Sequence, residues 1–326
     1  MPEGAAAQPA VAVAVVSWNT RELLLRCLAS FEPDVRAGRA EVWVVDNGSE
    51  DGSAQAARDA APWATVLEPG ANLGFGRAVN EVARRTRGEW LVAANADVAL
   101  RPGALAALLA AGQDPRVGCA APRLVLPGGE TQDSVHALPT LPFTLAFNAG
   151  LHRLSRGLAR RMLVAGAWDP ERTRDVPWAV GALLLLRRAA FDAVGAFDER
   201  LWMYAEDLDL GWRLHDAGWR TRYVAEAEVL HESGAAARPA FGEQEVVSRF
   251  MGPTYAVVRR RRGLARARAT AAVNLLGVFA RLAWMIPMAR RADARDAEEW
   301  EERIHALWGW RAVHRDALRR LMRRGA

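Results

Sequence analysis

The chain contains no lysine and only two cysteines among its 326 residues. Every basic side chain other than histidine is therefore an arginine. Cys27 and Cys119 are too few for a disulfide scaffold or for a zinc module built from several cysteines. Met1–Ala10 lacks the charged start and the apolar stretch of a secretory signal, so we expect a cytoplasmic protein.

Long uninterrupted apolar segments are also absent. A membrane-spanning helix needs about 18 or more consecutive apolar residues. The most apolar segment, residues 269–289, contains Arg281 and Pro287, so no spanning helix is predicted. No internal repeat or long low-complexity segment is found either.

Apolar material is nevertheless ample, because 51% of the residues are hydrophobic and 25% are charged. This composition excludes intrinsic disorder for most of the chain. The length fits one large α/β domain, or one domain with an appendage. Charge is unevenly distributed, since residues 249–326 hold 18 arginines and only seven acidic residues. We therefore expect one domain over residues 1–248 and a basic helical extension over 249–326 that faces lipid or nucleic acid.

Short apolar runs alternate with segments of helical periodicity. The predicted strands are residues 11–16, 41–45, 65–67, 89–93, 178–186 and 222–230, and the predicted helices include 54–61, 74–87, 102–111 and 205–217. This alternation predicts βαβ units in a mostly parallel sheet flanked by helices. Residues 134–176 break the rhythm and are predicted to form an insertion over the active-site end of the sheet.

Three polar clusters follow predicted strands: Ser17–Asn19, Asp46–Ser49 and Asn95–Asp97. Ligands of open parallel sheets bind beyond the carboxyl ends of the strands. Turns are rich in the same residue types for backbone reasons alone, which is the alternative for each cluster taken singly. Three clusters at successive strand ends favour a binding site.

Two other polar features have both a catalytic and a structural interpretation. Acidic residues at 206, 207 and 209 complement the dipole of a predicted helix, and Asp209 is spaced to pair with Arg213. The aromatic residues at 202–204 would instead desolvate a neighbouring carboxylate and raise its proton affinity, as a general base requires. His231 ends a predicted strand, where a histidine is either structural or a metal ligand.

Taken in order, these motifs resemble the inverting family-2 glycosyltransferases, especially the bacterial rhamnosyltransferase-like branch that builds cell-surface polysaccharide. The resemblance covers about residues 10–233. It is carried by residues 13–17 with Asn19, by 44–49, 72–76, Asn80, 95–98, 181–182 and 206–210. It implies the GT-A fold and transfer of a sugar from a nucleotide diphosphate, dTDP-linked or UDP-linked.

The resemblance also implies roles for individual residues. The nucleotide or donor would be bound by Ser17, Asn19, Asp46, Asn47, Ser49, Asn72, Gly74, Phe75, Asn80, Asn95 and Ala96. The donor sugar and the acceptor would be flanked by Trp178, Gly181, Ala182 and Trp202. Mn²⁺ or Mg²⁺ would be held by Asp97 and His231, and Asp207 would be the catalytic base, with Glu206 beside it.

Two details refine this implied function. Asn95 stands where an Asp-x-Asp metal motif has its first acid, as is common in the rhamnosyltransferase-like branch. The Gln-x-x-Arg-Trp motif of processive synthases is missing, so transfer of one sugar is expected. The first candidate for the donor is dTDP-rhamnose, which would supply rhamnose. The acceptor would be a glycan or a polyprenyl-linked sugar.

Two rival functions remain at this point. Gly74-Phe75-Gly76 before a helix suggests a nicotinamide-binding oxidoreductase, but Val79 stands where the third glycine of that fingerprint would be. A catalytically silent scaffold with the same fold would have no use for Asp97, Asp207 and His231 together.

The basic extension contains Arg259–Arg262 beside a largely apolar helical segment. Such a combination, with a tryptophan, favours a helix that lies at the cytoplasmic membrane surface. The alternative is a helix packed on the catalytic domain or on a second subunit of a homo-oligomer. No recognition motif for nucleic acid is found, so none is expected as a partner.

Overall fold

The computed structural model describes residues 10–232, 243–291 and 293–323. Contacts divide the chain into two compact units. The described part of the first, here called the sheet unit, is residues 10–136 and 169–232. That of the second, the helical unit, is residues 137–168, 243–291 and 293–323. Residues 134–176, expected as one insertion, are thus divided between the two units.

The sheet unit is built on a nine-stranded sheet with the strand order β3-β2-β1-β4-β10-β6-β11-β5, and β8 pairs with β11. Its strands are β1 Val11–Ser17, β2 Ala40–Asp46, β3 Thr65–Leu67, β4 Trp90–Asn95, β5 Val98–Leu100, β6 Val117–Val125, β8 Arg174–Val176, β10 Leu183–Arg187 and β11 Arg220–His231. The strands β3, β2, β1 and β4 are parallel, as are β6 and β11, whereas β10, β5 and β8 run antiparallel to their neighbours. The predicted mostly parallel sheet is confirmed.

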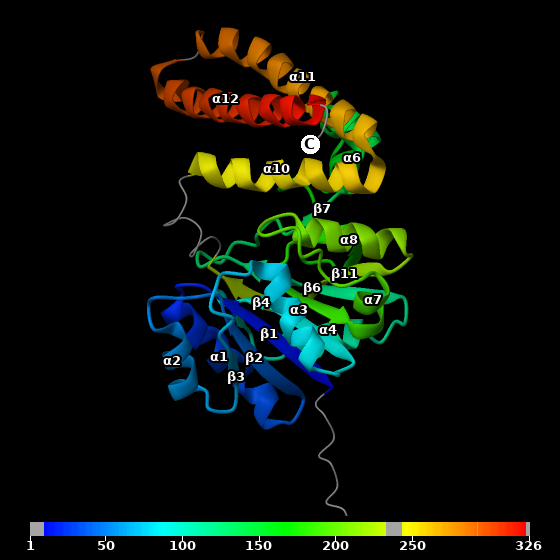
Figure 1. Cartoon of the computed structure of the whole chain (residues 1–326). Helices are drawn as coiled ribbons and strands as arrows, with labels where there is room; N and C mark the ends of the chain where they lie inside the picture. Colours follow the sequence, from blue (N-terminus) through cyan, green and yellow to red (C-terminus); the bar gives the residue numbers. More distant parts are fainter. Residues whose placement is uncertain (1–9, 233–242, 292, 324–326) are drawn as a thin grey trace, which may run out of the picture. The chain divides into compact units, whose positions relative to one another are not determined.

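Helices cover both faces of this sheet (Figure 1). Alternate residues of a strand point to opposite faces. Val11, Val13 and Val15 of β1 therefore join the apolar core formed with α1 Arg21–Arg36, α2 Ser53–Ala60 and α4 Ala104–Ala111. The other face carries α3 Phe75–Arg85, α7 Arg188–Ala193 and α8 Glu206–Asp216. The result is a three-layer α/β/α arrangement.

The strand predicted over residues 178–186 is in fact two strands. A short strand, β9 Trp178–Ala179, pairs with β7 Val135–His136 in a separate two-stranded sheet, and β10 begins only at Leu183. The break falls at Gly181, whose backbone N–H bonds a side chain of α8 instead of a strand. An unbroken run of apolar residues carries no signal for such a break.

The sequence pattern also missed β5, β6 and α7. The β6 sequence, VGCAAPRLV, contains glycine, alanine and proline, which are depleted in strands. It is nevertheless central, pairing with both β10 and β11. Burial between its neighbours outweighs the weak intrinsic preference of these residues.

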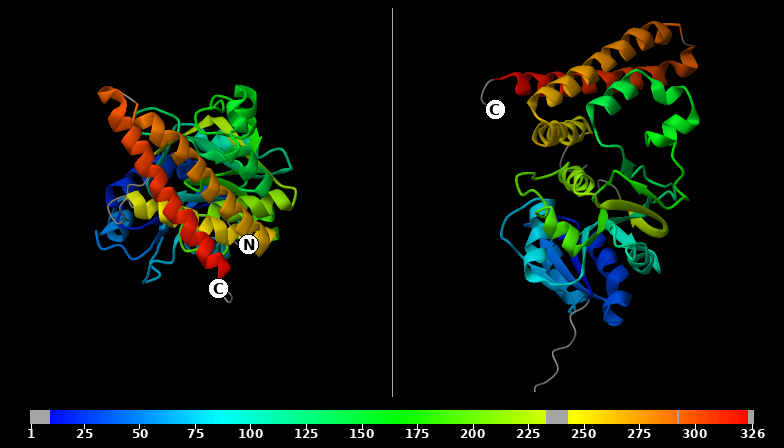
Figure 2. Two further views of the ribbon diagram at one scale, coloured as in Figure 1. Left: turned by 90° about the horizontal axis from the view of Figure 1, so that it is seen from above. Right: turned by 90° about the vertical axis from the view of Figure 1, so that its right-hand side faces the viewer.

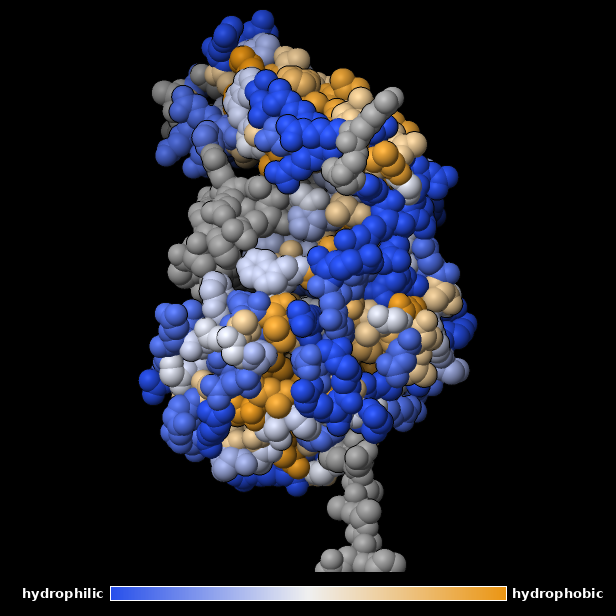
Figure 3. Space-filling view, viewed as in Figure 1, coloured by the Kyte–Doolittle hydropathy of each residue, from blue (hydrophilic) through white to orange (hydrophobic). Residues whose placement is uncertain are grey.

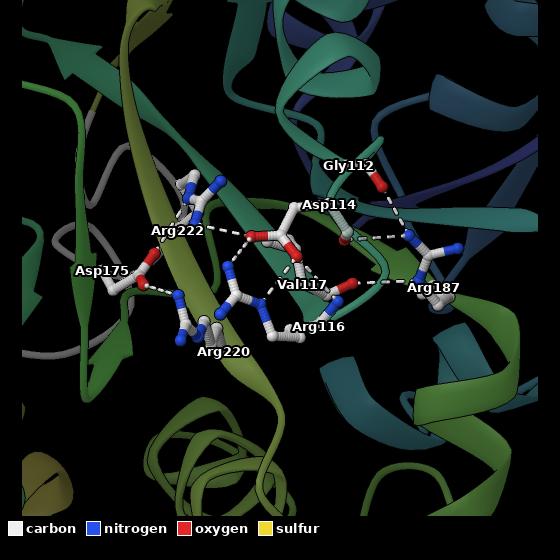
Figure 4. A network of polar contacts seen from close by, with 8 residues as sticks. All are labelled: Gly112, Asp114, Arg116, Val117, Asp175, Arg187, Arg220 and Arg222. Carbon is white, nitrogen blue, oxygen red and sulfur yellow. Dashed lines mark hydrogen bonds and ion pairs between the residues drawn. The ribbon is translucent and has the colours of Figure 1, made fainter.

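The amino ends of β6 and β11 are joined by a network of arginines and aspartates (Figure 4). Asp114 accepts hydrogen bonds from Arg116 and Arg222, and Asp175 of β8 accepts from Arg220 and Arg222. The Arg116 guanidinium, followed by the Arg116 backbone N–H, holds the pKa of Asp114 well below its ordinary value. Both carboxylates at this end of the sheet are thus paired with arginines.

The helical unit consists of α5 Leu141–Asn148, a 3₁₀ turn η1 Leu151–Arg153, α6 Arg156–Arg161, α10 Glu243–Arg262, α11 Leu264–Ala289 and α12 Ala294–Met322. A chain of hydrogen bonds between buried and half-buried side chains connects four of the helices. Asn148 donates to Asn274, Asn274 donates to the Tyr255 hydroxyl, and that hydroxyl bonds His314 at 2.8 Å. A polar network of this kind favours one arrangement of the helices.

The helix α11 packs along α12 and also contacts α10 and α5 (Figure 2). Contrary to our expectation from the sequence, α11 is long and apolar enough to span a membrane, with a mean hydropathy of 1.6 over its most apolar window. Core helices of soluble proteins meet the same criteria. We expected Arg281 to interrupt the apolar surface of this helix, but it does not. Its side chain is half-buried and donates a hydrogen bond to Asn148.

Candidate active site

The three polar clusters meet at the carboxyl ends of the parallel strands of the sheet unit. Ser17 pairs with Asp46 in the register of β1 and β2. The Ala96 backbone N–H donates to the Val16 carbonyl of β1, and the Asn95 N–H donates to the Ala182 carbonyl beside β10. Because β1, β2 and β4 are parallel neighbours, side chains as far apart in the sequence as Ser17 and Asp97 lie along one edge.

The clusters after β1 and β2 lock together through their side chains. Asp46 Oδ1 accepts from the Ser49 backbone N–H at 2.8 Å, and the Ser49 hydroxyl accepts from the Asn19 N–H at 2.9 Å. The Asn19 side-chain amide oxygen, Oδ1, accepts from the Glu50 N–H at 2.8 Å. Asp46 is buried, and within the described residues its second oxygen, Oδ2, has no hydrogen-bond partner. A buried carboxylate oxygen left open in this way is suited to accept a hydrogen bond from a ligand.

Ser17 and Asn47 support the loops that follow β1 and β2. The Ser17 hydroxyl is buried and bonds Thr20 at 3.1 Å, and its backbone carbonyl accepts from the Asn47 N–H. The Asn47 side chain accepts from the Leu73 N–H at 3.3 Å, which ties the loop before α3 to the end of β2. Both side chains therefore fix loops of the site.

Gly74 is the entry to α3 and passes very close to Trp202. Its φ is +78°, and a Cβ at this position would lie 2.0 Å from the Trp202 carbonyl oxygen, so no other residue fits. Asn72 accepts from the Gly74 N–H through its side chain, and its carbonyl accepts from the Trp202 indole at 3.4 Å. Trp202 stays exposed above this loop.

Phe75 and Asn80, on α3, both hold the segment before Trp202. The Phe75 ring packs edge-on against Phe197 at 5.8 Å between ring centroids. The Asn80 amide is buried and makes three bonds, two to the backbone of Phe197 and one to the Glu199 carboxylate. Asn80, on α3, thus anchors the loop that contains Phe197 and Glu199.

Asp97 and His231 are 134 positions apart in the sequence and adjacent in the fold. Asp97 lies in the turn between β4 and β5, and His231 is the last residue of β11, which pairs with β5. His231 Nε2 is 3.5 Å from Asp97 Oδ1, and both side chains are buried. Oδ1 of Asp97 has no hydrogen-bond partner in the part of the chain that the structure describes.

Gln132 decides which nitrogen of His231 faces Asp97. The Gln132 side-chain oxygen lies 2.6 Å from His231 Nδ1 and accepts a hydrogen bond from its N–H. In the neutral form of an imidazole bonded in this way, the other nitrogen, Nε2, carries the lone pair. Nε2 faces Asp97 Oδ1 across 3.5 Å. Gln132 is a site residue that the sequence analysis missed, and an isolated glutamine in a loop carries no signal that could have identified it.

This pair of donors fits a divalent cation. A buried open carboxylate oxygen, an imidazole lone pair and a hydrogen bond that orients the imidazole are the usual parts of a metal site. Among the described residues, no cluster of three or more histidine, cysteine or acidic side chains could hold a metal on its own. Phosphate oxygens and water would therefore complete the coordination, as is common for Mg²⁺ on nucleotides.

Asp207 is the second residue of α8, and its carboxylate is held by two backbone N–H groups. Gly181 donates to Oδ2 at 2.9 Å, and Leu208 donates to Oδ1 at 2.7 Å. The Cβ that Gly181 lacks would stand 3.1 Å from Asp207 Cβ. Burial raises the pKa of Asp207, and the two N–H donors oppose that rise.

Glu206 has the opposite environment. It is buried, its Oε2 has no hydrogen-bond partner within the described chain, and burial, followed by the charge of Asp207, raises its pKa to about 8. Asp207 is partly exposed and its carboxylate is held by two N–H donors, so hydrogen bonds favour its charged form more than that of Glu206. Neighbouring carboxyls with separated proton affinities are typical of an acid–base site.

The backbone before α8 is strained. Tyr204 and Ala205 have φ values of +62° and +65°, a left-handed conformation that costs energy in residues with a side chain. The structural interpretation of the helix is also correct in part, since buried Asp209 pairs with Arg213 at 2.8 Å. The ion pair anchors the helix, and the strained turn directs Glu206 and Asp207 into the site.

Trp178 and Ala182, which were expected beside the donor sugar and the acceptor, are both buried. Trp178 packs against Gly211 of α8, where an added Cβ would be 2.5 Å away, and its ring lies 4.9 Å from that of His136. Ala182 supports the end of β4 through its carbonyl. The two cysteines, Cys27 and Cys119, are buried and free, and burial raises the pKa of both thiols.

Solved structures share the fold. The mannosyltransferase PcManGT from Pyrobaculum calidifontis, solved with GDP-Man and Mn²⁺, matches 96% of this chain and 86% of its own, with a TM-score of 0.58 and 19% identity. GalNAc-T7, solved with UDP, GalNAc and Mn²⁺, matches 68% of this chain and 43% of its own, with a TM-score of 0.51 and 16% identity. These likenesses confirm the expected GT-A-like fold.

Sequence comparison establishes the family. Residues 12–192 match Glycosyl transferase family 2, and residues 148–287 match Glycosyl transferase family group 2. The N-acetylglucosaminyl-diphospho-decaprenol L-rhamnosyltransferase of Mycobacterium tuberculosis is 39% identical over 235 residues, which cover 67% of this chain and 75% of that protein. The oxidoreductase and scaffold alternatives are therefore set aside. This chain belongs to glycosyltransferase family 2 and is a rhamnosyltransferase-like glycosyltransferase.

Proposed function

We propose that this enzyme transfers one L-rhamnose, with inversion, from dTDP-rhamnose to a polyprenyl-diphosphate-linked N-acetylglucosamine. One observation supports this reaction type. Asp207, the candidate base, and the Asp97–His231 pair, the candidate metal site, lie at the same edge of the sheet. The 39% identity to a protein named for L-rhamnosyl transfer to such a lipid supports the choice of sugar and acceptor.

Asp207 is the proposed general base. Its carboxylate takes the proton of the acceptor hydroxyl as that oxygen bonds to the anomeric carbon of the donor sugar, and the bond to the diphosphate breaks with its electron pair. The Gly181 and Leu208 N–H groups orient the carboxylate and keep it ionised. Glu206, with its raised pKa, adds no second negative charge near neutral pH.

The nucleotide is proposed to lie against Asp46, whose open Oδ2 would accept the imino N–H of thymine or uracil. Asn19 and Ser49 are tied to the same loop, so they would shape the pocket. The backbone N–H groups at the start of α3, after Gly74, would face the diphosphate.

Asp97 and His231 are proposed to hold Mn²⁺ or Mg²⁺, in keeping with the Mn²⁺ of the solved structures above. When bound, the cation would neutralise the charge that develops on the leaving diphosphate. Gln132 would keep His231 in the tautomer that presents Nε2. A lipid-linked acceptor would place the enzyme at the cytoplasmic face of the membrane.

Calorimetric titration of the purified chain with dTDP, UDP and GDP, with and without Mn²⁺, tests this proposal. We expect metal-dependent binding of dTDP or UDP, lost in Asp97→Ala. We expect Gln132→Leu to weaken Mn²⁺ binding in the presence of dTDP by about 10–100-fold, as is typical when the outer partner of a ligating histidine is removed.

The matched control is Gln132→Glu, which keeps an acceptor oxygen for Nδ1 and should bind Mn²⁺ nearly as well as the natural chain. Equal binding of dTDP with and without Mn²⁺ would remove the cation from the proposal. A preference for GDP would remove dTDP-rhamnose as the donor.

A further inference from the structure

The exposed side of α11 carries an uninterrupted apolar surface. Among residues 275–289, every exposed side chain is apolar. These residues, here called the apolar stripe, are Leu276, Phe279, Ala280, Ala283, Trp284, Pro287 and Met288. Their spacing of three and four places them on one side of the helix, over about 18 Å. Figure 3 shows apolar side chains gathered along α11, near the top of the view.

The stripe is well exposed within the helical unit. Leu276 is 67% exposed and Trp284 is 55% exposed, although both are large and apolar. The opposite side of α11 is buried against its neighbours through residues such as Ala271, Val278 and Leu282. Packing inside the unit therefore uses one side of the helix and leaves the other for a different environment.

Aromatic residues of α12 extend the stripe at its edge. The Trp284 ring contacts that of Trp300 at 6.1 Å, and the Arg311 guanidinium lies over both Phe279 and the exposed Trp308. Tryptophan beside arginine is typical of the boundary between lipid tails and headgroups, where each has an apolar body and a polar tip.

Positive charge is present at both ends of the stripe. Exposed Arg266 precedes it, exposed Arg290 and Arg291 follow it, and α11 contains no acidic residue. We propose that the apolar stripe is a membrane-docking surface that lies flat in the headgroup region of an anionic lipid bilayer. The apolar side chains would enter the acyl boundary, and the arginines would contact lipid phosphates.

The stripe could be covered in two other ways, and the structure argues against the first. A spanning α11 would take along α12, which is paired with it along its length and carries Glu298, Glu299, Glu301 and Glu302, and charges inside a bilayer are costly. A second copy docked stripe to stripe is the other alternative, and the oligomeric state of the natural chain tests it.

Flotation of the full chain with lipid vesicles tests the proposal. We expect binding to phosphatidylcholine vesicles that contain phosphatidylglycerol, weaker binding to phosphatidylcholine alone, and loss of the difference at high salt. The double variant Leu276→Gln/Trp284→Gln should partition at least about tenfold more weakly. Leu276→Gln alone, at a position without a ring contact, should show part of this loss.

The matched control is Leu154→Gln, since Leu154 is 76% exposed in the same unit but lies off α11. It should float like the natural chain. Binding of dTDP should be unchanged in every variant, which separates this surface from the proposed function. Unaltered flotation of the double variant would overturn the proposal. So would retention of the natural chain in alkali-washed membranes, or a dimer that the double variant converts to a monomer.

Discussion

The two ends of the central sheet use the same residue types in opposite ways. At the amino ends of β6 and β11, Asp114 and Asp175 are each bonded to arginines. At the carboxyl ends, Asp46, Asp97 and Glu206 are buried and each has one oxygen without a hydrogen-bond partner in the described structure. A buried oxygen of this kind is costly unless a ligand completes it. The first end is therefore organised for stability and the second for binding.

The largest expected effect is at the carboxyl end. Asp207→Asn keeps the size of the side chain and can still accept from Gly181, but it loses the proton-accepting charge. We expect transfer to fall by about 10²–10⁴-fold, the usual contribution of a general base, with dTDP binding unchanged. Product formation from dTDP-rhamnose measures it, and a residual rate within threefold of the natural enzyme would reject Asp207 as the base.

A second prediction concerns the pH dependence of stability. The pKa of Glu206 is raised from its ordinary value to about 8 in the folded chain, so the folded state binds the extra proton. Its contribution to stability is complete below about pH 4.5 and is lost as the pH rises to about 8. We expect Glu206→Gln to lose less stability than the natural chain between pH 5 and pH 8, by a few kcal/mol at most.

Urea unfolding at the two pH values measures this difference. The control is Glu228→Gln, a carboxyl that is partly exposed and paired with Arg123, for which the pH dependence should follow that of the natural chain. Parallel curves for the natural chain and Glu206→Gln would show that Glu206 is ionised in the folded state.

The smallest expected effect is at the amino end. Arg222→Met removes bonds to both Asp114 and Asp175, and exposed ion pairs contribute about 0.2–1 kcal/mol each. We expect the melting temperature to fall by a few degrees, with metal-dependent dTDP binding unchanged. Calorimetric melting and titration measure the two quantities. Loss of nucleotide binding at an unchanged melting temperature would contradict the division between the two ends.

Much of the sheet unit could be predicted from the sequence. The valine-rich runs that form β1 and β2 depend on local periodicity, so both strands were found within one residue at each end. The order of the motifs identified the family and predicted the fold, both of which the comparisons confirm. By contrast, β6 was missed, because its place between two strands outweighs its composition.

The candidate site was predictable as a set of residue types but not as a set of contacts. Asp97 and His231 were singled out separately, yet only the pairing of β5 with β11 places them 3.5 Å apart. Trp178 was expected beside the substrate, and the structure buries it under α8. Gln132 was not singled out, because its role depends entirely on the histidine that it faces.

The sequence by itself therefore determined which chemistry the chain carries and where along the sheet it falls, since strand periodicity and turn composition are local properties. Only the tertiary structure decided which polar atoms stay without a partner, which of two adjacent carboxyls keeps its proton, and which side of α11 is exposed. Those properties depend on burial and on neighbours far along the chain, and electrostatic interactions strengthen when water is excluded.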